Sequence, residues 1–186
     1  PYGLSKELFD RWVFKQNRRP PSWQGLKFFN VYGPNEYHKG EQASLVFKAF
    51  HQIRMEGRVR LFKSYHPSYS DGGQLRDFVY VKDAVDIMIH FMQKGAACPS
   101  GIYNVGTGRA QSFLDLANAA FAALAREPVI EYIEMPAGIR GQYQYFTQAD
   151  LKKLRQAAGY KKEMMDVAAG VGDYIRNHLK LADPYL

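Results

Sequence analysis

Apolar positions along this chain recur in two kinds of pattern, one with the spacing of a helical face and one typical of short buried strands. Segments of the two kinds alternate. In residues 2–16, Tyr2, Lys6, Phe9 and Val13 recur at the spacing of one helical face. Helical spacing returns in later segments, and short apolar runs typical of buried strands lie between them. The helical segments are residues 43–55, 82–93, the stretch after 112–115, the stretch after 147–150, and 163–179, and the apolar runs are 26–32, 58–62, 78–81, 102–105 and 129–135. This alternation predicts an α/β protein.

Local signals mark where these elements begin and end. Arg18-Arg19-Pro20-Pro21 ends the first helix, because consecutive prolines cannot continue it. Residues 112–115 (Ser-Phe-Leu-Asp) and 147–150 (Thr-Gln-Ala-Asp) both have the form of a capping box, and Gly159 predicts the stop of the second helix. Residues 66–73 are rich in Pro, Ser, Asp and Gly and predict a loop. Because the strands are few and irregularly spaced, we expect the tail of a larger α/β fold plus an appended small domain.

Composition and charge narrow the class of protein. The 186 residues are 46% hydrophobic and 15% aromatic, which supports a core and argues against disorder. The net charge of +7 favours an anionic partner, but no block of five or six basic residues occurs. We therefore expect a small anionic ligand, such as a nucleotide-sugar or a phosphorylated cofactor, and regard nucleic acid as the minor alternative.

Residue types and segments that the sequence lacks argue against several classes of protein. Cys98 is the only cysteine, so no internal disulfide is possible, which fits a reducing compartment such as the cytoplasm. There is no run of about 18 apolar residues, so we expect no membrane span. We expect no signal peptide in the first residues, because Lys6, Asp10 and Arg11 interrupt them. The five histidines show no metal-ligand spacing, so we expect no metal site.

Tyr2 and Lys6 are the first candidate pair for chemistry. A spacing of four places them about 40° apart on one helical face. A nearby ammonium favours the phenolate form of a tyrosine, which makes the phenol a better base. The alternative is a chance pair on a solvated helix. Because Lys6 lies on a mostly apolar stripe, where a lysine needs a reason, we favour the functional interpretation.

Other candidates each carry a structural alternative. Lys39 follows a predicted strand at the end where α/β sheets bind ligands, but the segment is also compatible with a solvated turn. Arg76 could hold a diphosphate by a bidentate contact, or it could form an ion pair with Asp77 or another carboxylate. Tyr143 and Tyr145 could stack on a base or a sugar, or they could only fill the core.

The stretch Gly106-Thr107-Gly108-Arg109 is similar to the start of a dinucleotide-binding fingerprint. Its third glycine is missing, because Gln111 and Ser112 follow instead. We predict a tight turn from a strand into a helix, and we find no cofactor fingerprint in the sequence.

Six motifs resemble a known family. Residues 1–6 (Pro-Tyr-Gly-Leu-Ser-Lys), 28–34 (Phe-Phe-Asn-Val-Tyr-Gly-Pro) and 76–81 (Arg-Asp-Phe-Val-Tyr-Val) resemble the extended short-chain dehydrogenase/reductases that act on nucleotide-sugars. Three further stretches resemble the ADP-heptose epimerases in that family: residues 35–40, 106–113 and 145–151. Members of the family begin with a Rossmann portion that carries the glycine-rich loop. The resemblance therefore implies that the chain corresponds to the later half of such an enzyme.

The resemblance implies an epimerase of lipopolysaccharide precursor synthesis that oxidises an ADP-sugar transiently with bound NADP or NAD. It assigns Tyr2 and Lys39 as acid/base groups on opposite sides of the sugar, while Lys6 contacts the cofactor ribose and tunes Tyr2. Val31 and Lys39 are further cofactor contacts. The implied substrate contacts are Asn30, Phe62, Lys63, Ser64, Arg76 and Tyr143.

The resemblance also implies an architecture, namely the C-terminal part of a Rossmann-type NAD(P)-binding fold plus a small α/β substrate-binding domain. Residues 1–34 would be the tail of the dinucleotide-binding domain. Residues 35–186 would be mainly substrate-binding, with a short return to the Rossmann sheet near 76–106. We expect a homo-oligomer in the cytoplasm, an inactive chain when it is isolated, and a face of Phe9 and Val13 turned to water or to a partner chain.

The exact sugar stays open at this point. Glu41 and Lys48 stand where the family has small polar and histidine contacts, and the loop 65–73 is longer than usual. Another nucleotide-sugar 4-epimerase or 4,6-dehydratase is one alternative. A non-catalytic fragment that serves as a binding or assembly module is another.

Overall fold

The strands within the described part of the chain form three small sheets. The computed structural model describes residues 2–185. The strands are β1 (Gln24–Phe28), β2 (Asn30–Tyr32), β3 (Val59–Phe62), β4 (Leu75–Tyr80), β5 (Gly101–Val105), β6 (Ala110–Ser112) and β7 (Ile130–Ile133). β1 pairs with β5, β2 and β6 flank β4, and β3 pairs with β7. All pairs are parallel except β4 with β6. Parallel strands joined through helices confirm the predicted α/β class.

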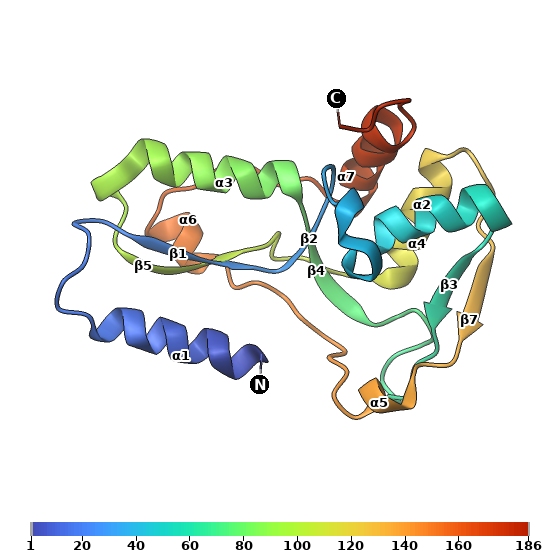
Figure 1. Ribbon diagram of the computed structural model, residues 1–186, viewed down its shortest axis with the longest axis horizontal. Helices are drawn as coiled ribbons and strands as arrows, with labels where there is room; N and C mark the ends of the chain where they lie inside the picture. Colours follow the sequence, from blue (N-terminus) through green and yellow to red (C-terminus); the bar gives the residue numbers. More distant parts are fainter. Residues whose placement is uncertain (1, 186) are drawn as a thin grey trace.

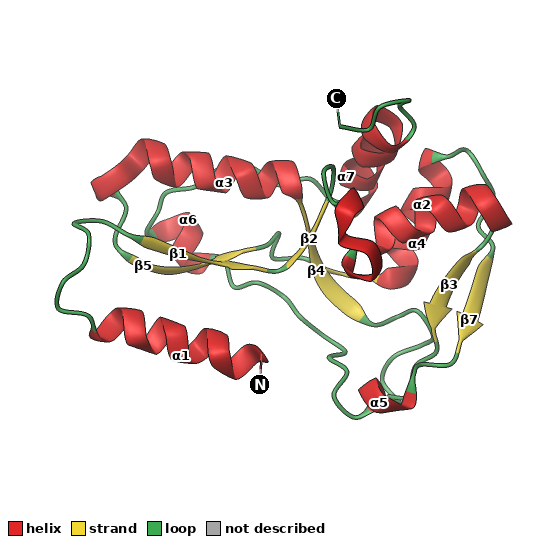
Figure 2. Cartoon of the chain, in the orientation of Figure 1, coloured by secondary structure: helices red, strands yellow, loops and turns green. Residues whose placement is uncertain are grey.

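Helices cover these sheets (Figure 2). They are α1 (Tyr2–Lys15), α2 (Leu45–Glu56), α3 (Val81–Lys94), α4 (Phe113–Ala123), α5 (Ala137–Arg140), α6 (Lys152–Gln156) and α7 (Val167–Tyr174), with shorter turns η1 (Tyr37–Gln42), η2 (Gly95–Ala97) and η3 (Ile175–Leu179). Helix α3 lies on one face of the β1–β5 sheet and α1 on the other (Figure 1). Across residues 2–185, each helix is too short or too polar to cross a lipid bilayer.

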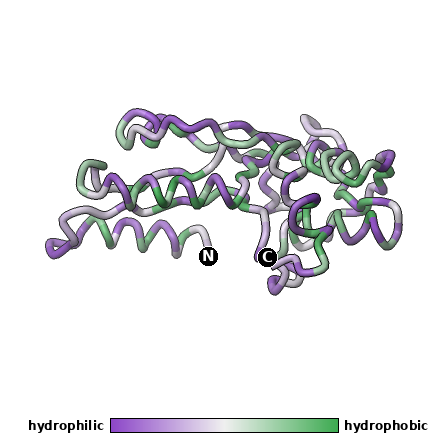
Figure 3. Tube along the Cα trace, turned by 90° about the horizontal axis from the view of Figure 1, so that it is seen from above, coloured by the Kyte–Doolittle hydropathy of each residue, from purple (hydrophilic) through white to green (hydrophobic). Residues whose placement is uncertain are grey.

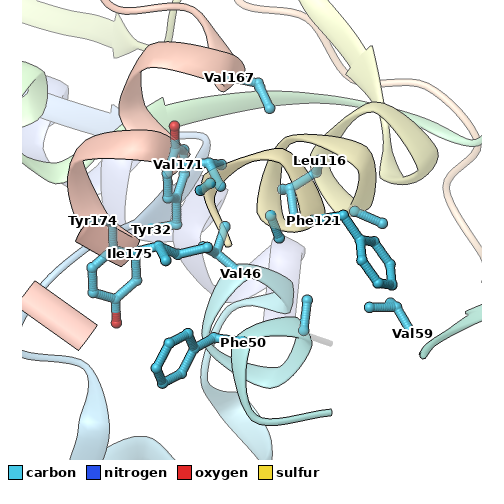
Figure 4. Close-up of a cluster of buried hydrophobic side chains, with 14 of the residues drawn as sticks. Tyr32, Val46, Phe50, Val59, Leu116, Phe121, Val167, Val171, Tyr174 and Ile175 are labelled. Carbon is cyan, nitrogen blue, oxygen red and sulfur yellow. The ribbon is translucent and has the colours of Figure 1, made fainter. Parts of the chain in front are cut away.

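The larger core lies where α2, α4 and α7 meet β2 and β4. Figure 4 shows Val46, Leu116 and Val171, from three different helices, pointing toward one another. Phe50 and Phe121 are fully buried in the same cluster. A second, smaller core packs α3 and α6 against β5. The burial of large apolar side chains at helical spacing explains why the predicted helices form here.

The predicted strand at residues 26–32 is wrong as a single element, because it is split between two sheets. Phe29 lies at the change of partner: its N–H donates to the Val105 carbonyl at 3.0 Å, and its carbonyl accepts from the Val31 N–H at 2.9 Å. β1 therefore ends its pairing with β5, and β2 begins to pair with β4 at Asn30 and Phe78. A continuous apolar run carries no signal of which strand lies beside it.

The two predicted capping boxes have different outcomes. Ser112 and Asp115 form a complete box at the start of α4, with both side-chain to backbone bonds at 2.9 Å, which confirms the first. The box at 147–150 is wrong, because helix α6 begins at Lys152. The Ala149 N–H instead donates to the carboxylate of Asp77 at 2.9 Å, which ties this segment to β4.

Two further predictions concern the end of α6 and the start of α7. Gly159 has the left-handed backbone φ of 68°, and the Tyr160 N–H donates to the Leu154 carbonyl at 3.2 Å, which confirms the predicted stop. The last helix starts at Val167 rather than at residue 163. Asp166 caps it by accepting the Ala169 N–H at 2.7 Å.

The turn at residues 106–109 leads into strand β6 rather than directly into a helix, which corrects the sequence prediction. The buried carboxylate of Asp77 organises this turn. It accepts the N–H groups of Thr107 at 2.7 Å and Gly108 at 2.8 Å, as well as the Thr107 hydroxyl. A Cβ on Gly106 would lie 2.7 Å from the Ala149 Cβ, so this position requires glycine. Asp77 therefore joins β4, this turn and the segment before α6.

Candidate active site

Helix α1 places the ammonium of Lys6 beside the ring of Tyr2. The Lys6 Nζ lies 5.2 Å from the centroid of the Tyr2 ring, as the spacing of four predicts. Tyr2 is 78% exposed and Phe9 is 60% exposed. The exposure of Phe9 confirms the expectation for this face, whereas Val13 is only partly exposed. Figure 3 shows α1 along one side of the molecule, with apolar and polar residues mixed along it.

Few contacts attach α1 to the rest of the protein. Asp10 forms an ion pair with Lys27 of β1, and the ring of Phe14 meets that of Trp23 at 5.3 Å. Between the helix and β1 lies a cavity of about 450 Å³. Tyr2 and Lys6 both line this cavity, so the candidate acid/base pair faces a space of ligand size.

Lys39 lies in η1, directly after β2. Together with Asn30 and Val31 it lines a cavity of about 250 Å³, so the structure brings these three predicted residues together. Lys39 also lines a neighbouring cavity of about 720 Å³ with Lys82 and Lys162. Within residues 2–185, those two lysines pair with Asp173 and Asp86, whereas Lys39 has no carboxylate partner. Lys39 is thus the lysine of this cavity that is available for a ligand.

A buried glutamate holds the segment that carries Lys39. Glu36 is buried, and its carboxylate accepts the Ser44 N–H at 2.7 Å and the Ser44 hydroxyl at 2.6 Å. The Glu36 carbonyl accepts the Lys39 N–H at 3.0 Å. Sequence reasoning missed Glu36, because a charged residue in a polar loop carries no local signal of burial.

Tyr2 and Lys39 line different cavities, one along β1 and the others at the end of β2. The two proposed acid/base groups therefore do not share one cavity among those described here. That Tyr2 and Lys39 lie on opposite sides of a bound sugar stays a prediction.

Arg76 on β4 is only 7% exposed. Its Nη1 donates to the Leu75 carbonyl at 2.8 Å, and its guanidinium carbon lies 5.2 Å from the Tyr143 ring and 5.7 Å from the Phe113 ring. The alternative of an ion pair with Asp77 is wrong, because the Asp77 carboxylate is occupied by three backbone N–H groups. Burial lowers the pKa of Arg76, but a guanidinium stays charged near neutral pH. Among residues 2–185 Arg76 has no carboxylate partner, and a buried cation of this kind favours an anionic ligand.

Phe62 and Tyr143 line a fourth cavity, of about 360 Å³. The structure therefore brings these two predicted substrate contacts together. Burial raises the pKa of the Tyr143 phenol, so this side chain is neutral near neutral pH. Glu41 and Lys48 line the same cavity and pair with each other at 3.0 Å. The two residues that depart from the family pattern thus lie beside the candidate substrate contacts.

Lys63 and Ser64 already have partners within the protein. The Lys63 Nζ lies 2.7 Å from Oε1 of Glu134, and this hydrogen bond raises the pKa of Lys63. The Ser64 N–H donates to Asp71 at 2.6 Å. A ligand phosphate would have to compete with Glu134 for the ammonium of Lys63. Within residues 2–185, no group of three or more His, Cys, Asp or Glu side chains is arranged to hold a metal ion.

Comparison with known proteins identifies the family to which the chain belongs. Residues 1–106 match the NAD dependent epimerase/dehydratase family, and the chain belongs to this family. The chain is 52% identical to the ADP-L-glycero-D-manno-heptose-6-epimerase of Fusobacterium nucleatum, covering 100% of this chain and 57% of that protein. It is 51% identical to the protein of the same name from Nitratidesulfovibrio vulgaris, of which it covers 56%. The chain thus spans a little over half the length of these curated relatives.

Solved structures agree with this assignment. The crystal structure of the Helicobacter pylori ADP-L-glycero-D-manno-heptose-6-epimerase superposes with a TM-score of 0.76 and 30% identity, over 95% of this chain and 50% of that chain. UDP-glucose 4-epimerase from Thermotoga maritima has a TM-score of 0.74 and 24% identity, over 97% of this chain and 54% of that one. The second likeness shows the fold alone.

Proposed function

We propose that this chain supplies the acid/base residues and the substrate-binding part of a nucleotide-sugar epimerase. Its substrate would be ADP-D-glycero-D-manno-heptose, its product the ADP-L-glycero-D-manno epimer, and its cofactor NADP or NAD. The observation that carries the proposal is the Lys6 ammonium, 5.2 Å from the Tyr2 ring, in a chain of this family. The 52% identity to an ADP-heptose epimerase supports the choice of sugar.

The cavity between α1 and β1 would hold the nicotinamide end of the cofactor; its volume of about 450 Å³ and the presence of Tyr2 and Lys6 in its lining support this placement. A nicotinamide bound there would supply the hydride acceptor and donor for the transient oxidation of the sugar. Lys6 would donate a hydrogen bond to a ribose hydroxyl and stabilise the phenolate of Tyr2. Val31 and Lys39 would contact the cofactor from the end of β2.

Inversion at a carbinol carbon needs a proton transfer at each face. The Tyr2 oxygen would take the proton of the sugar hydroxyl as the carbon loses its hydride, which leaves a carbonyl. After the carbonyl is presented by its other face, the Lys39 ammonium would give a proton to the oxygen as the hydride returns. The overall reaction leaves the sugar at its original oxidation level. Each direction of the reaction uses both residues, so both are required.

The substrate would be held by its diphosphate and base. Arg76 would contact the diphosphate, since a buried guanidinium without a carboxylate partner matches a phosphate by a planar fork of N–H groups. Tyr143 and Phe62 would line the space beside it, and Asn30 would contact the sugar. Lys63 and Ser64, at the end of β3, would complete the contacts to the nucleotide.

The sheet pairing supports the proposed division of the chain. β5, at residues 101–105, pairs with β1, so the chain returns to the sheet on which residues 1–34 are built. The segment 35–186 also builds the α2, α4 and α7 core and the β3–β7 sheet, while α3 and α6 pack against β5. This is the arrangement expected of a cofactor-binding tail followed by a substrate-binding domain.

We further propose a homo-oligomer in the cytoplasm. The exposed apolar side chains of α1, namely Leu4, Leu8, Phe9 and Trp12, support a contact with another protein surface. The buried, free Cys98 supports a reducing compartment. Light scattering of the complete protein in solution measures the number of copies, and a monomer would contradict the first of these proposals.

The test of the function uses Tyr2→Phe and Lys39→Met in the complete protein, with NMR detection of the epimerised sugar. We expect each change to lower turnover by about 10²–10⁴-fold, the usual contribution of a general acid or base. Tyr132→Phe and Lys94→Met make the same chemical changes at exposed positions outside the cavities and are the matched controls. Unchanged epimerisation in both test variants would contradict the assignment.

The same assay separates the alternatives. Incubation with ADP-heptose and with UDP-glucose, followed by product analysis, distinguishes a heptose epimerase from a 4-epimerase or a dehydratase. Equilibrium dialysis of labelled NADP against the 186-residue chain tests the alternative of a non-catalytic module, which firm binding would refute.

A further inference from the structure

A chain of aromatic rings connects the buried guanidinium of Arg76 to the protein surface. Tyr143 lies against Arg76, and the ring of Tyr145 is 5.5 Å from that of Tyr143. Beyond Tyr145 lie His66 at 5.1 Å and Tyr69 at 5.3 Å, and these two rings are 5.3 Å from each other. His66 is exposed, whereas the three tyrosines are half-buried. These edge-on and tilted ring contacts therefore form a continuous aromatic cluster that ends on a buried cation.

The loop of residues 64–73 supplies the outer part of this cluster and is closed at its base. The Ser64 N–H donates to Asp71 Oδ1 at 2.6 Å, which joins the two ends of the loop. The Tyr65 N–H donates to the Tyr145 hydroxyl at 3.0 Å. Compact loops of this length with adjacent ends are frequently functional. Tyr145 thus joins the loop to Tyr143 through both its hydroxyl and its ring.

Arg76 needs such support, because little else orients it. Among residues 2–185, its hydrogen bonding is limited to the contact from Nη1 to the carbonyl of the preceding residue, Leu75. A guanidinium has five N–H donors, so most of its capacity is left for a ligand. A long side chain loses rotamer freedom when it binds an anion, unless neighbouring groups already hold it in place. Ring contacts on its faces supply that restraint without occupying its donors.

We propose that Tyr145 and Tyr69 are positioning residues that hold Tyr143 against Arg76, so that the guanidinium is oriented in advance for the diphosphate of the substrate. The proposal rests on the proposed function, from which it takes the diphosphate. Neither tyrosine has to touch the ligand, because each acts through its neighbour in the cluster. The loop of residues 64–73 thereby gains a role in substrate binding.

Calorimetric binding of ADP and of adenosine to the complete protein tests this proposal. In Tyr145→Leu we expect ADP to bind roughly tenfold more weakly, a loss of about 1.4 kcal/mol, while adenosine changes less than about twofold. Tyr145→Phe keeps the ring and should retain most of the affinity for ADP. Phe146→Leu removes an exposed aromatic ring from the adjacent position, outside the cluster, and is the matched control.

A purely structural role for Tyr145 predicts a different result. Equal weakening of ADP and adenosine in Tyr145→Leu, or no weakening of either, overturns the proposal. Tyr69→Leu is the second variant, with an expected loss in the same direction but smaller, and it decides the matter if Tyr145→Leu does not fold. With nucleotide-sugar as substrate, KM should rise in both variants while kcat stays within about twofold.

The outcome is independent of the proposed reaction, since binding of ADP needs no turnover. A wild-type protein that binds ADP but does not epimerise ADP-heptose would overturn the proposed function and leave the comparison of variants intact.

Discussion

Helix α1 and strand β4 both carry residues of the candidate site, yet the protein holds them in different ways. No residue of α1 is buried, and Tyr2 meets Lys6 only because they lie one turn apart. Five of the six residues of β4 are buried, including Arg76 and Asp77. The acid/base pair therefore depends on local helix geometry, whereas the anion-binding arginine depends on packing from distant parts of the chain. Reactive groups can be set by spacing alone, but a buried charge needs a tertiary environment.

The largest expected difference between these regions is in stability. Phe121→Ala removes a fully buried ring from the larger core and should lower the free energy of unfolding of the 186-residue chain by about 3–5 kcal/mol. Phe9→Ala makes the same change on α1 and should cost no more than about 0.5 kcal/mol in the unassociated 186-residue chain, because Phe9 is exposed there. Urea unfolding measures both. Similar losses of unfolding free energy in the two variants would show that the face of α1 is covered in solution. They would contradict the contrast between α1 and the buried core.

A second pair of variants compares the two aspartates. Asp77→Ala leaves the N–H groups of Thr107, Gly108 and Ala149 without their acceptor, and should lower the free energy of unfolding by about 3 kcal/mol or more. Asp10→Ala removes the ion pair of α1 with Lys27 and should cost at most about 1 kcal/mol. The same urea experiment checks this order. A large loss for Asp10→Ala would mean that α1 is anchored more firmly than its contacts indicate.

The smallest expected effect concerns acid stability. Although burial opposes it, hydrogen bonds from Lys82, Tyr80 and Asn177 lower the pKa of Asp173 to about 2. Because this pKa lies below the unfolded value of about 3.9, the stabilisation is present above about pH 4 and is lost as pH falls toward 2. Asp173→Asn should therefore be less stable than the wild type at pH 7, with the difference shrinking below pH 4.

Urea unfolding at several pH values measures this difference for Asp173→Asn. Asp183→Asn, at an exposed carboxyl near the end of the described residues, is the control. A difference for Asp173→Asn that stays constant from pH 7 to pH 3 would contradict the role of its carboxylate in joining α7 to β4.

The elements that the sequence predicted well are those whose signals are local. The helix at 2–16 ends one residue earlier, at Lys15, and the capping box at Ser112 forms as its residues predict. The α/β class and the family followed from periodicity and from motifs within short stretches. Their physical basis lies in backbone geometry and in hydrogen bonds over three or four residues, which the neighbouring sequence contains in full.

Only the tertiary structure decided the features that depend on distant partners. The run at 26–32 divides at Phe29 because its two halves pair with different strands, and the box at 147–150 fails because Asp77 takes the Ala149 N–H. The same holds for Arg76, whose alternative partner Asp77 is occupied by groups 30 or more residues away. A side chain chooses among competing hydrogen-bond partners after the fold brings them together, and the sequence near it does not contain that choice.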